Sequence, residues 1–366
     1  MKKILLFSIL LFLISCEPLV NNFEKGDNVE NYKAKEMTEA ADSVETVKFM
    51  TWNIRFGVGR TNWFGDSCGD RVIVPEAEVK DNLQRIADFI NKTQPDILFL
   101  QEIDVESKRT AYIDQVKWLL NHTDLNYGVY ASMWDAQYVP SDGIGRINTG
   151  NAILSRWKIK ESERIQLPLR GDQDGVTKYF YLRRNMLKTR IEFPGIDDFY
   201  AICVHMSAFS TDDTKQKQID KIGNELMDLE DAKFFLGGDF NLLPPGSDSI
   251  DFCHEDGCED DKIHQGDIDK DDYHKEGSYF GEEIHLMQPL YEKYNSAVPH
   301  ENFLADQLGH FTHSTQWDDG FWDRKLDYIF SNYEWITGSD STYQDDTFDH
   351  RLSDHVPVSI EWRVVK

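Results

Sequence analysis

Basic residues are scarce in this chain of 366 residues, which has 39 Lys and Arg against 65 Asp and Glu and a formal net charge of −26. Proteins that hold nucleic acid on a broad basic surface need clustered Lys and Arg to displace the counterions of the phosphates. The composition therefore disfavours that class of protein. It does not exclude an enzyme that acts on a phosphodiester through a bound cation, because the charge of the ion dominates locally.

Long apolar runs are also scarce, and the one at the start of the chain, Ile4 to Ile14, is too short to span a bilayer, which takes about 20 residues. It follows two lysines, which is the layout of a secretory signal. The next residues complete the sequence Leu13-Ile14-Ser15-Cys16, which resembles the lipobox of bacterial lipoproteins. The resemblance implies that residues 1–15 are a signal peptide and that Cys16 is lipidated. An ordinary signal peptide with a chance cysteine is the alternative.

A lipid on Cys16 would anchor the protein in a bacterial envelope membrane, outside the cytoplasm, on the periplasmic face or the cell surface. Residues 16–46 are polar and show no sustained period, so we expect a flexible spacer there. A structural N-terminal arm is the alternative. Residues 47–366 are then one large domain, with an acidic insertion at about 245–300.

Cysteine is scarce too, with five in the chain. Cys253 and Cys258 lie in an acidic loop with sequence CHEDGC, and an oxidising compartment favours a small disulfide there. A zinc site that adds His254 or His264 is the alternative. Cys203 lies in the apolar run FYAICVH, so we expect it to be buried in a strand.

Strands and helices alternate from residue 47 onward. Short apolar runs predict strands at 47–56, 95–104, 148–156, 188–193, 197–206, 232–241, 324–332 and 354–362, and apolar residues at helical spacing predict helices at 78–94, 112–120 and 211–229. Continuous apolar strands indicate sheets that are covered on both faces. We therefore expect an α/β sandwich of two sheets with helices outside.

Polar residues follow several of these apolar strands, where a rigid scaffold can bring them to one site. They are Asn53, Glu102, His205, Asp239 with Asn241, Asp327, and Asp354 with His355. Each has a structural explanation by itself, such as a turn cap or a solvated strand end. Together and in this order they predict a catalytic site.

The segments WNIR, LFLQE, GNAILSR, GDFN, LDYIF and SDHVPV resemble the endonuclease/exonuclease/phosphatase superfamily over roughly residues 47–365. The resemblance implies a four-layer α/β/β/α sandwich of two mainly antiparallel packed sheets flanked by helices. It also implies a hydrolase of phosphate esters that depends on Mg²⁺ or Mn²⁺, most of all a phosphodiesterase. A binding lipoprotein that has lost catalysis is the remote alternative, but it predicts damaged motifs, and the motifs are intact.

The resemblance also assigns a metal site. It makes Glu102 the principal ligand of the cation, with Asn53 and Asp354 contributing. Carboxylate and amide oxygens suit Mg²⁺ or Mn²⁺ better than zinc. Such a cation would neutralise the charge that develops on the phosphoryl oxygens during hydrolysis.

The catalytic roles follow from the same resemblance. Asp239 would orient or deprotonate the attacking water, and Asn241 would hold that water or donate to a phosphoryl oxygen. His355 would donate to the scissile phosphate, with Asp327 fixing its tautomer. His205 matches a histidine of deoxyribonuclease-like and sphingomyelinase-like members where abasic-site endonucleases have tyrosine, so the abasic-repair branch is disfavoured.

The substrate stays open between nucleic acid, a lipid head group as in sphingomyelinases and phospholipases C, and an inositol phosphate. Three aromatic residues close to Asp327 could stack a base, pack against a sugar or touch lipid, or could belong to the core; they are Trp317, Phe321 and Trp322. Arg109, Arg183 and Arg184 are candidates for phosphate contacts, with surface ion pairs as the alternative.

Overall fold

The computed structural model describes residues 19–21, 23, 29–40, 43–65, 69–208, 210–248, 281–314, 322–344 and 352–365. Its strands are β1 (Val29–Lys33), β2 (Thr46–Asn53), β3 (Ile97–Asp104), β4 (Tyr127–Val139), β5 (Gly145–Ser155), β6 (Ile159–Gln166), β7 (Asn185–Ile191), β8 (Phe199–His205), β9 (Lys233–Asp239), β10 (Asn295–Ser296), β11 (Asp327–Ser331), β12 (Ser341–Thr342) and β13 (Val358–Arg363). The α-helices are α2 (Glu76–Thr93), α3 (Gln115–Leu120), α4 (Gly175–Phe180), α5 (Thr214–Met227), α8 (Gln288–Lys293) and α9 (His300–Ala305).

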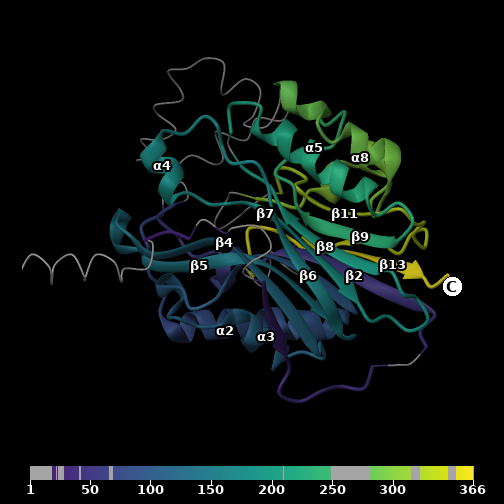
Figure 1. Cartoon of the computed structure of the whole chain (residues 1–366), viewed down its shortest axis with the longest axis horizontal. Coiled ribbons are helices and arrows are strands. Elements are labelled where there is room, and N and C mark those ends of the chain that lie inside the picture. The colour runs from purple at the N-terminus through teal and green to yellow at the C-terminus, as the bar shows by residue number, and fades with distance from the viewer. Residues whose placement is uncertain are drawn as a thin grey trace, which may run out of the picture.

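These strands form two sheets. Within the described residues, one sheet has seven strands in the order β1-β4-β5-β3-β2-β13-β12, and the other has six in the order β10-β11-β9-β8-β7-β6. β2 and β3 are parallel, as are β8 and β9, and the remaining pairs are antiparallel. Figure 1 shows α2 and α3 below the first sheet and α5 and α8 above the second. The predicted α/β/β/α sandwich is confirmed.

The layers follow from the alternation of side chains along each strand. On β2, Phe49 points between the sheets, where its ring stacks on Phe235 of β9 at a centroid distance of 4.2 Å. The next residue, Met50, packs on the other face with Leu83 and Ile86 of α2. Both faces of the strand are therefore buried, which explains its unbroken apolar sequence.

One glycine allows the two sheets to approach closely. A Cβ atom at Gly237 of β9 would lie 2.3 Å from a ring carbon of Phe99 on β3. Real contacts are never that short, so a larger residue would force β9 away from the first sheet. The glycine thus helps to bring the ends of β3 and β9 together.

In the part of the chain that the structure describes, each sheet contains one βαβ unit, and these units position the site. In the first, α2 connects β2 to its parallel neighbour β3, and in the second, α5 connects β8 to β9. The strands of a parallel pair end at the same edge of their sheet. Because the two sheets pack face to face, the ends of all four strands meet at one side of the sandwich.

The segment predicted as a spacer is in part a structural element. Residues 29–33 form β1, which pairs antiparallel with β4 at the edge of the seven-stranded sheet. Closer to the N-terminus, Val20 is buried and forms a bridge with Ala136. The prediction of a flexible spacer is therefore wrong for these residues, because backbone pairing with β4 holds them, and the alternative of a structural arm applies.

The acidic insertion predicted at 245–300 is shorter than expected. Residues 281–300 contain η4 (Gly281–His285), α8 and β10. Met287 and Leu290 are buried in the core that α5 forms on the six-stranded sheet. This part of the segment belongs to the fold because its apolar residues cover the sheet, and residues 249–280 lie outside the described part of the chain.

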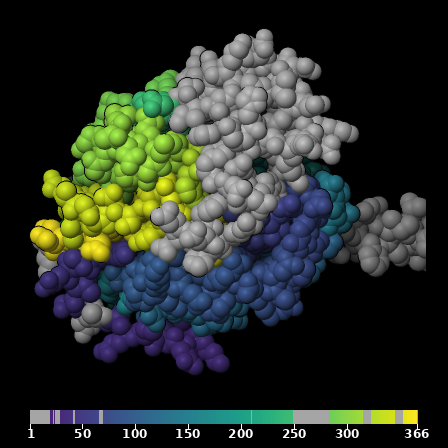
Figure 2. Space-filling model, turned by 180° about the vertical axis from the view of Figure 1, so that it is seen from behind, coloured from purple at the N-terminus to yellow at the C-terminus, as the bar shows by residue number. Residues whose placement is uncertain are grey.

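Several other predictions fall outside the described residues: those on Cys16, Cys253, Cys258, Trp317 and Phe321. Cys203 is described, and it is fully buried on β8 as expected. In the part of the chain that the structure describes, no helix combines the length and the apolar character needed to cross a membrane. Figure 2 shows the purple and blue N-terminal half and the green and yellow C-terminal part side by side on one face.

Candidate active site

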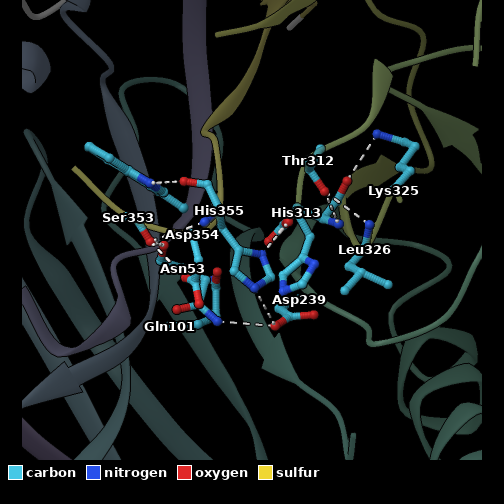
Figure 3. A network of polar contacts seen from close by, with 12 residues as sticks. Asn53, Gln101, Asp239, Thr312, His313, Lys325, Leu326, Ser353, Asp354 and His355 are labelled. Atoms are coloured by element: carbon cyan, nitrogen blue, oxygen red, sulfur yellow. Dashed lines mark hydrogen bonds and ion pairs between the residues drawn. The ribbon is translucent and has the colours of Figure 1, made fainter. Parts of the chain in front are cut away.

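Polar side chains from both sheets meet at the carboxyl ends of β2 and β9 (Figure 3), and the end of β8 contributes His205 to the same place. Asn53 is the last residue of β2, His205 of β8 and Asp239 of β9. Asp239 Oδ2 accepts a hydrogen bond from Asn53 Nδ2 at 3.1 Å and lies 3.2 Å from His205 Nε2. Three of the predicted residues are therefore in direct contact, although they are far apart in the sequence.

Asp239 is buried and surrounded by donors. Its Oδ1 accepts from the backbone N–H of Asn241 at 2.9 Å, and its Oδ2 lies 3.9 Å from His355 Nε2. Burial by itself raises the pKa of Asp239, but its contact with His205, the charge of His355 and the hydrogen bond from Asn241 outweigh it and hold that pKa below the ordinary value. The carboxylate is therefore ionised at neutral pH and acts as an acceptor.

Asn241 holds an unusual backbone conformation next to Asp239. Its φ of 49° lies in the left-handed region, which asparagine tolerates better than most residues. Its Nδ2 donates to Met206 O at 3.2 Å, which ties the end of β9 to the end of β8. The amide is thereby placed beside Asp239, as the sequence predicts.

Glu102 has the clearest backbone strain in the site. It lies in a β-bulge between Leu100 and Ile103, and its φ is 54°. Its Oε1 is 3.9 Å from His205 Nε2, and its side chain is 26% exposed. Within the described residues no group donates a hydrogen bond to this carboxylate. Strain of this kind persists where the surrounding structure enforces it and is common at functional sites.

His355 and Asp327 form a buried pair. His355 Nδ1 lies 2.8 Å from Asp327 Oδ2, and the opposite ring nitrogen faces Asp239. Burial lowers the pKa of His355, but the charges of Asp327 and Asp239 raise it overall to about 10. Burial raises the pKa of Asp327. His355 is therefore a cation at neutral pH, and its Nε2–H is available as a donor at the centre of the site.

Asp354 lies beside this centre in an ion pair. Its Oδ2 is 3.2 Å from Arg55 Nε, and its Oδ1 accepts from Ser353 Oγ at 3.2 Å. Burial raises the pKa of Asp354, but the charge of Arg55 outweighs it and lowers that pKa. Ser353 Oγ also lies 2.8 Å from Asn53 O. Asp354 thus connects two loops of the site, and its role as a metal ligand stays a prediction.

His205 is buried in the site as a neutral imidazole. Burial lowers its pKa, and the charge of the neighbouring Arg184 lowers it further, against the opposite effect of Asp239. Its Nδ1 has no hydrogen-bond partner among the described residues. A neutral His205 can accept or relay a proton next to Asp239.

The three arginines that the sequence offers as candidates for phosphate contacts, Arg109, Arg183 and Arg184, are all buried. Arg109 donates from Nε and Nη2 to Asp104 at 2.9 Å each, and its guanidinium lies 3.6 Å from the ring centroid of Phe56. It is therefore part of a buried ion pair, and neither a surface pair nor a phosphate contact. Arg183 donates to the backbone oxygens of Tyr179 and Tyr181, whereas Arg184 lies close enough to His205 to affect its pKa.

The site contains oxygen atoms that suit a hard divalent cation. Glu102 offers a carboxylate that lacks hydrogen-bond donors in the described part of the chain, and the carboxylate of Asp239 lies against the same nitrogen of His205. Asn53 contacts Asp239 through Nδ2, and its amide oxygen accepts from the backbone N–H of Arg55 at 3.0 Å. A second group in the same part of the chain could also ligate a metal: one side-chain atom each of Asp239, Asp327 and His355 lies within 4.8 Å of the others. In that group, His355 and Asp327 are already hydrogen-bonded to each other and are not available as metal ligands. The group around Glu102 therefore fits a divalent cation better.

Two site residues were not predicted from the sequence. His313 lies against His355, with ring centroids 4.8 Å apart, and its Nδ1 is 2.9 Å from the buried Asp323. Neither residue follows an apolar strand in the sequence, which was the signal for the others. The backbone bridge between His313 and His355 becomes visible only in the tertiary structure.

Solved structures share this fold at low sequence identity. An endonuclease/exonuclease/phosphatase from Beutenbergia cavernae DSM 12333 is 17% identical, with a TM-score of 0.56 over 88% of this chain and 72% of its own. TDP2 of D. rerio, solved in complex with a single-strand DNA product, is 15% identical, with a TM-score of 0.51 over 88% of this chain and 100% of its own. A search of the curated proteins gave no match. Residues 50–355 match the Endonuclease/Exonuclease/phosphatase family, and the chain belongs to this family of phosphoester hydrolases.

Proposed function

We propose that this protein is a divalent-metal-dependent phosphodiesterase. The observation that carries the proposal is the contact of Asp239 with Asn53 and His205 at one end of the sandwich, with a charged His355 opposite. Hydrolysis of a phosphate ester needs an oriented water, donors to the phosphoryl oxygens and a cation. The site has candidates for each of these roles.

Asp239 is the candidate that orients the water. Its low pKa makes it a poor base, but an ionised carboxylate accepts a hydrogen bond from water and fixes its direction. The neutral His205 beside it can take up the proton. His355 donates from Nε2 to a phosphoryl oxygen, and Asp327 keeps its ring in place and stabilises its charge.

Glu102 and Asn53 are the residues that would hold the cation, with Asp239 at the edge of the same group. Their oxygen atoms favour Mg²⁺ or Mn²⁺. When bound, such an ion supplies charge neutralisation for the phosphoryl oxygens. The carboxylate of Glu102, to which no described residue donates a hydrogen bond, is the feature that supports this assignment.

For the substrate we propose a phosphodiester, with nucleic acid as the first candidate class. The single-strand DNA product in the D. rerio TDP2 structure is consistent with it. His205 is also consistent with it, because deoxyribonuclease-like members of the family have a histidine at the matching position. The net charge of −26 argues for local binding at the site and against a broad basic surface. Lipid head groups and inositol phosphates are the alternatives for the test.

We also propose that Cys16 carries a lipid and tethers the enzyme to the outer side of a bacterial envelope membrane. The support is the N-terminal sequence, since Cys16 lies outside the described residues. A Cys16→Ala variant should leave the membrane fraction on cell fractionation. Retention of that variant in the membrane would contradict the anchor.

The test of the catalytic proposal is a substrate panel. Purified protein would be assayed with Mg²⁺, Mn²⁺ or EDTA on bis(p-nitrophenyl) phosphate, plasmid DNA, RNA, sphingomyelin, phosphatidylcholine and inositol phosphates. We expect cation-dependent hydrolysis of the generic diester and of at least one natural class. Asp239→Asn and His355→Gln should each lower kcat by about 10²- to 10⁴-fold. No turnover of any substrate, or full activity of both variants, would overturn the proposal.

A further inference from the structure

His313 lies directly opposite His355 in a short antiparallel bridge. The backbone N–H of Ser314 donates to Asp354 O at 2.9 Å, and that of Val356 donates to Thr312 O at 2.8 Å. Residues directly opposite each other in such a pair project to the same side. The register therefore fixes the side chain of His313 next to that of His355, and their rings meet edge to face at a centroid distance of 4.8 Å (Figure 3).

The ring of His313 is held in one orientation. Its Nδ1 lies 2.9 Å from Asp323 Oδ1, and Asp323 is itself held by Arg324 Nε and Nη2 at 2.8 Å each. The side chain of Asp323 is fully buried. A carboxylate on one imidazole nitrogen orients the ring and determines what the other nitrogen does, as Asp327 does for His355.

The bridge is also tied to the base of the His355–Asp327 pair. Thr312 Oγ1 accepts from the backbone N–H of Leu326 at 2.9 Å and of Asp327 at 3.1 Å. One threonine thus connects the segment of His313 to the start of β11. The two histidine–carboxylate pairs are therefore held as one unit.

The second nitrogen of His313 is not used inside the protein. No described residue forms a hydrogen bond with its Nε2, and the side chain is 14% exposed, so a ligand can reach the ring. Elsewhere in the described site, the Nε2 atoms of His205 and His355 face Asp239. An oriented, accessible imidazole with one ring nitrogen left over is what a substrate-binding group requires.

We propose that His313 is a second phosphate-binding imidazole, which together with His355 clamps the phosphoryl group of the substrate. The inference rests on the proposed function. Two rings at this spacing can each place Nε2 within ordinary hydrogen-bond length of a different oxygen of one tetrahedral phosphate. Asp323 holds the His313 ring in the orientation that this contact requires. His313 is then a catalytic residue and Asp323 a positioning residue.

The test compares His313→Ala, His313→Gln and Asp323→Asn with a matched histidine control. His122→Ala is the control, because the His122 ring stacks on Trp118 and its backbone oxygen accepts from Asn91 near the end of α2, at the opposite edge of the sheet. With Mg²⁺ and bis(p-nitrophenyl) phosphate, we expect His313→Ala to lower kcat/KM about a hundredfold, the effect of losing one placed donor to a developing charge. His313→Gln should recover part of it through its amide, and Asp323→Asn should give a smaller loss.

Binding of inorganic phosphate tests the clamp independently of turnover. In NMR spectra of the imidazole nitrogens, phosphate should shift the Nε2 resonance of His313 in the wild-type protein, and His313→Ala should weaken phosphate binding at least tenfold. A wild-type protein that binds phosphate in this way but hydrolyses no ester would refute the proposed function and keep the clamp. Activity of His313→Ala within twofold of wild type, with unchanged phosphate affinity, would refute the clamp alone. If circular dichroism shows that His313→Ala does not fold, the clamp is tested by the activity of His313→Gln and by the phosphate titration of the wild-type protein.

Discussion

Asn53 and Asp239 join the two sheets at the site, through the hydrogen bond of 3.1 Å from Asn53 Nδ2 to Asp239 Oδ2. Asn53 ends β2 in the seven-stranded sheet, and Asp239 ends β9 in the six-stranded sheet. The site therefore forms only when the sheets pack together. Correct packing at Gly237 and Phe99 is a condition for activity.

The fall of kcat/KM at alkaline pH should report the loss of the proton from His355. Its pKa of about 10 means that the donating cation is present at neutral pH and is lost as the pH rises through that value. Asp327→Asn removes the charge that raises this pKa most, so the fall should move to lower pH. The measurement is kcat/KM against pH for both proteins. Coincident alkaline limbs would contradict this role of Asp327.

Glu102 should show a conflict between stability and activity. At its φ of 54° a glycine is relaxed, whereas any residue with a Cβ is strained. We expect Glu102→Gly to be more stable than Glu102→Ala by about 1 kcal/mol, and both to be inactive. Urea denaturation and the diester assay would measure the two effects. A glycine variant no more stable than the alanine variant would show that this backbone is not strained.

The buried ion pair of Asp104 and Arg109 should matter for stability. Their side chains are 0% and 5% exposed, so Asp104→Ala leaves an uncompensated guanidinium in the core, at a cost of about 3–5 kcal/mol. Glu78→Ala is the control, because it removes the exposed pair with Arg71 at a cost of about 1 kcal/mol or less. The two losses would be compared by urea denaturation. Equal losses would contradict the role of burial.

Cys203 should be unreactive in the folded protein. It is fully buried on β8, and burial raises the pKa of its thiol to about 12. At pH 8 the thiolate that reacts is therefore almost absent, and the reagent has no access. Peptide mapping by mass spectrometry after iodoacetamide treatment should find Cys203 modified only in denatured samples. Labelling in the native state at the rate of a free thiol would contradict the burial.

Local sequence patterns predicted much of the fold. The apolar positions of α2 recur at helical spacing, and the helix ends at Thr93, where Gln94 in the left-handed conformation caps it before Pro95. β4, by contrast, was not predicted, although it is a long strand of the first sheet. Its apolar and polar residues do not form a simple run, because one end pairs with β1 and the other buries Ala136 and Val139 in a separate small cluster with Val20. Whether such a segment forms a strand depends on its pairing with neighbouring strands in the tertiary structure, and not on its local pattern of apolar residues.

The sequence by itself determined the family, the alternation of buried strands and helices, and the polar residues that follow those strands, because these depend on local periodicity and on short motifs. Only the tertiary structure decided which of them meet. Asp354 is engaged by Arg55, and Arg109 is buried against Asp104, whereas His313 is placed beside His355. These contacts join residues through backbone register and sheet packing, and neither is encoded in the spacing of residues along the chain.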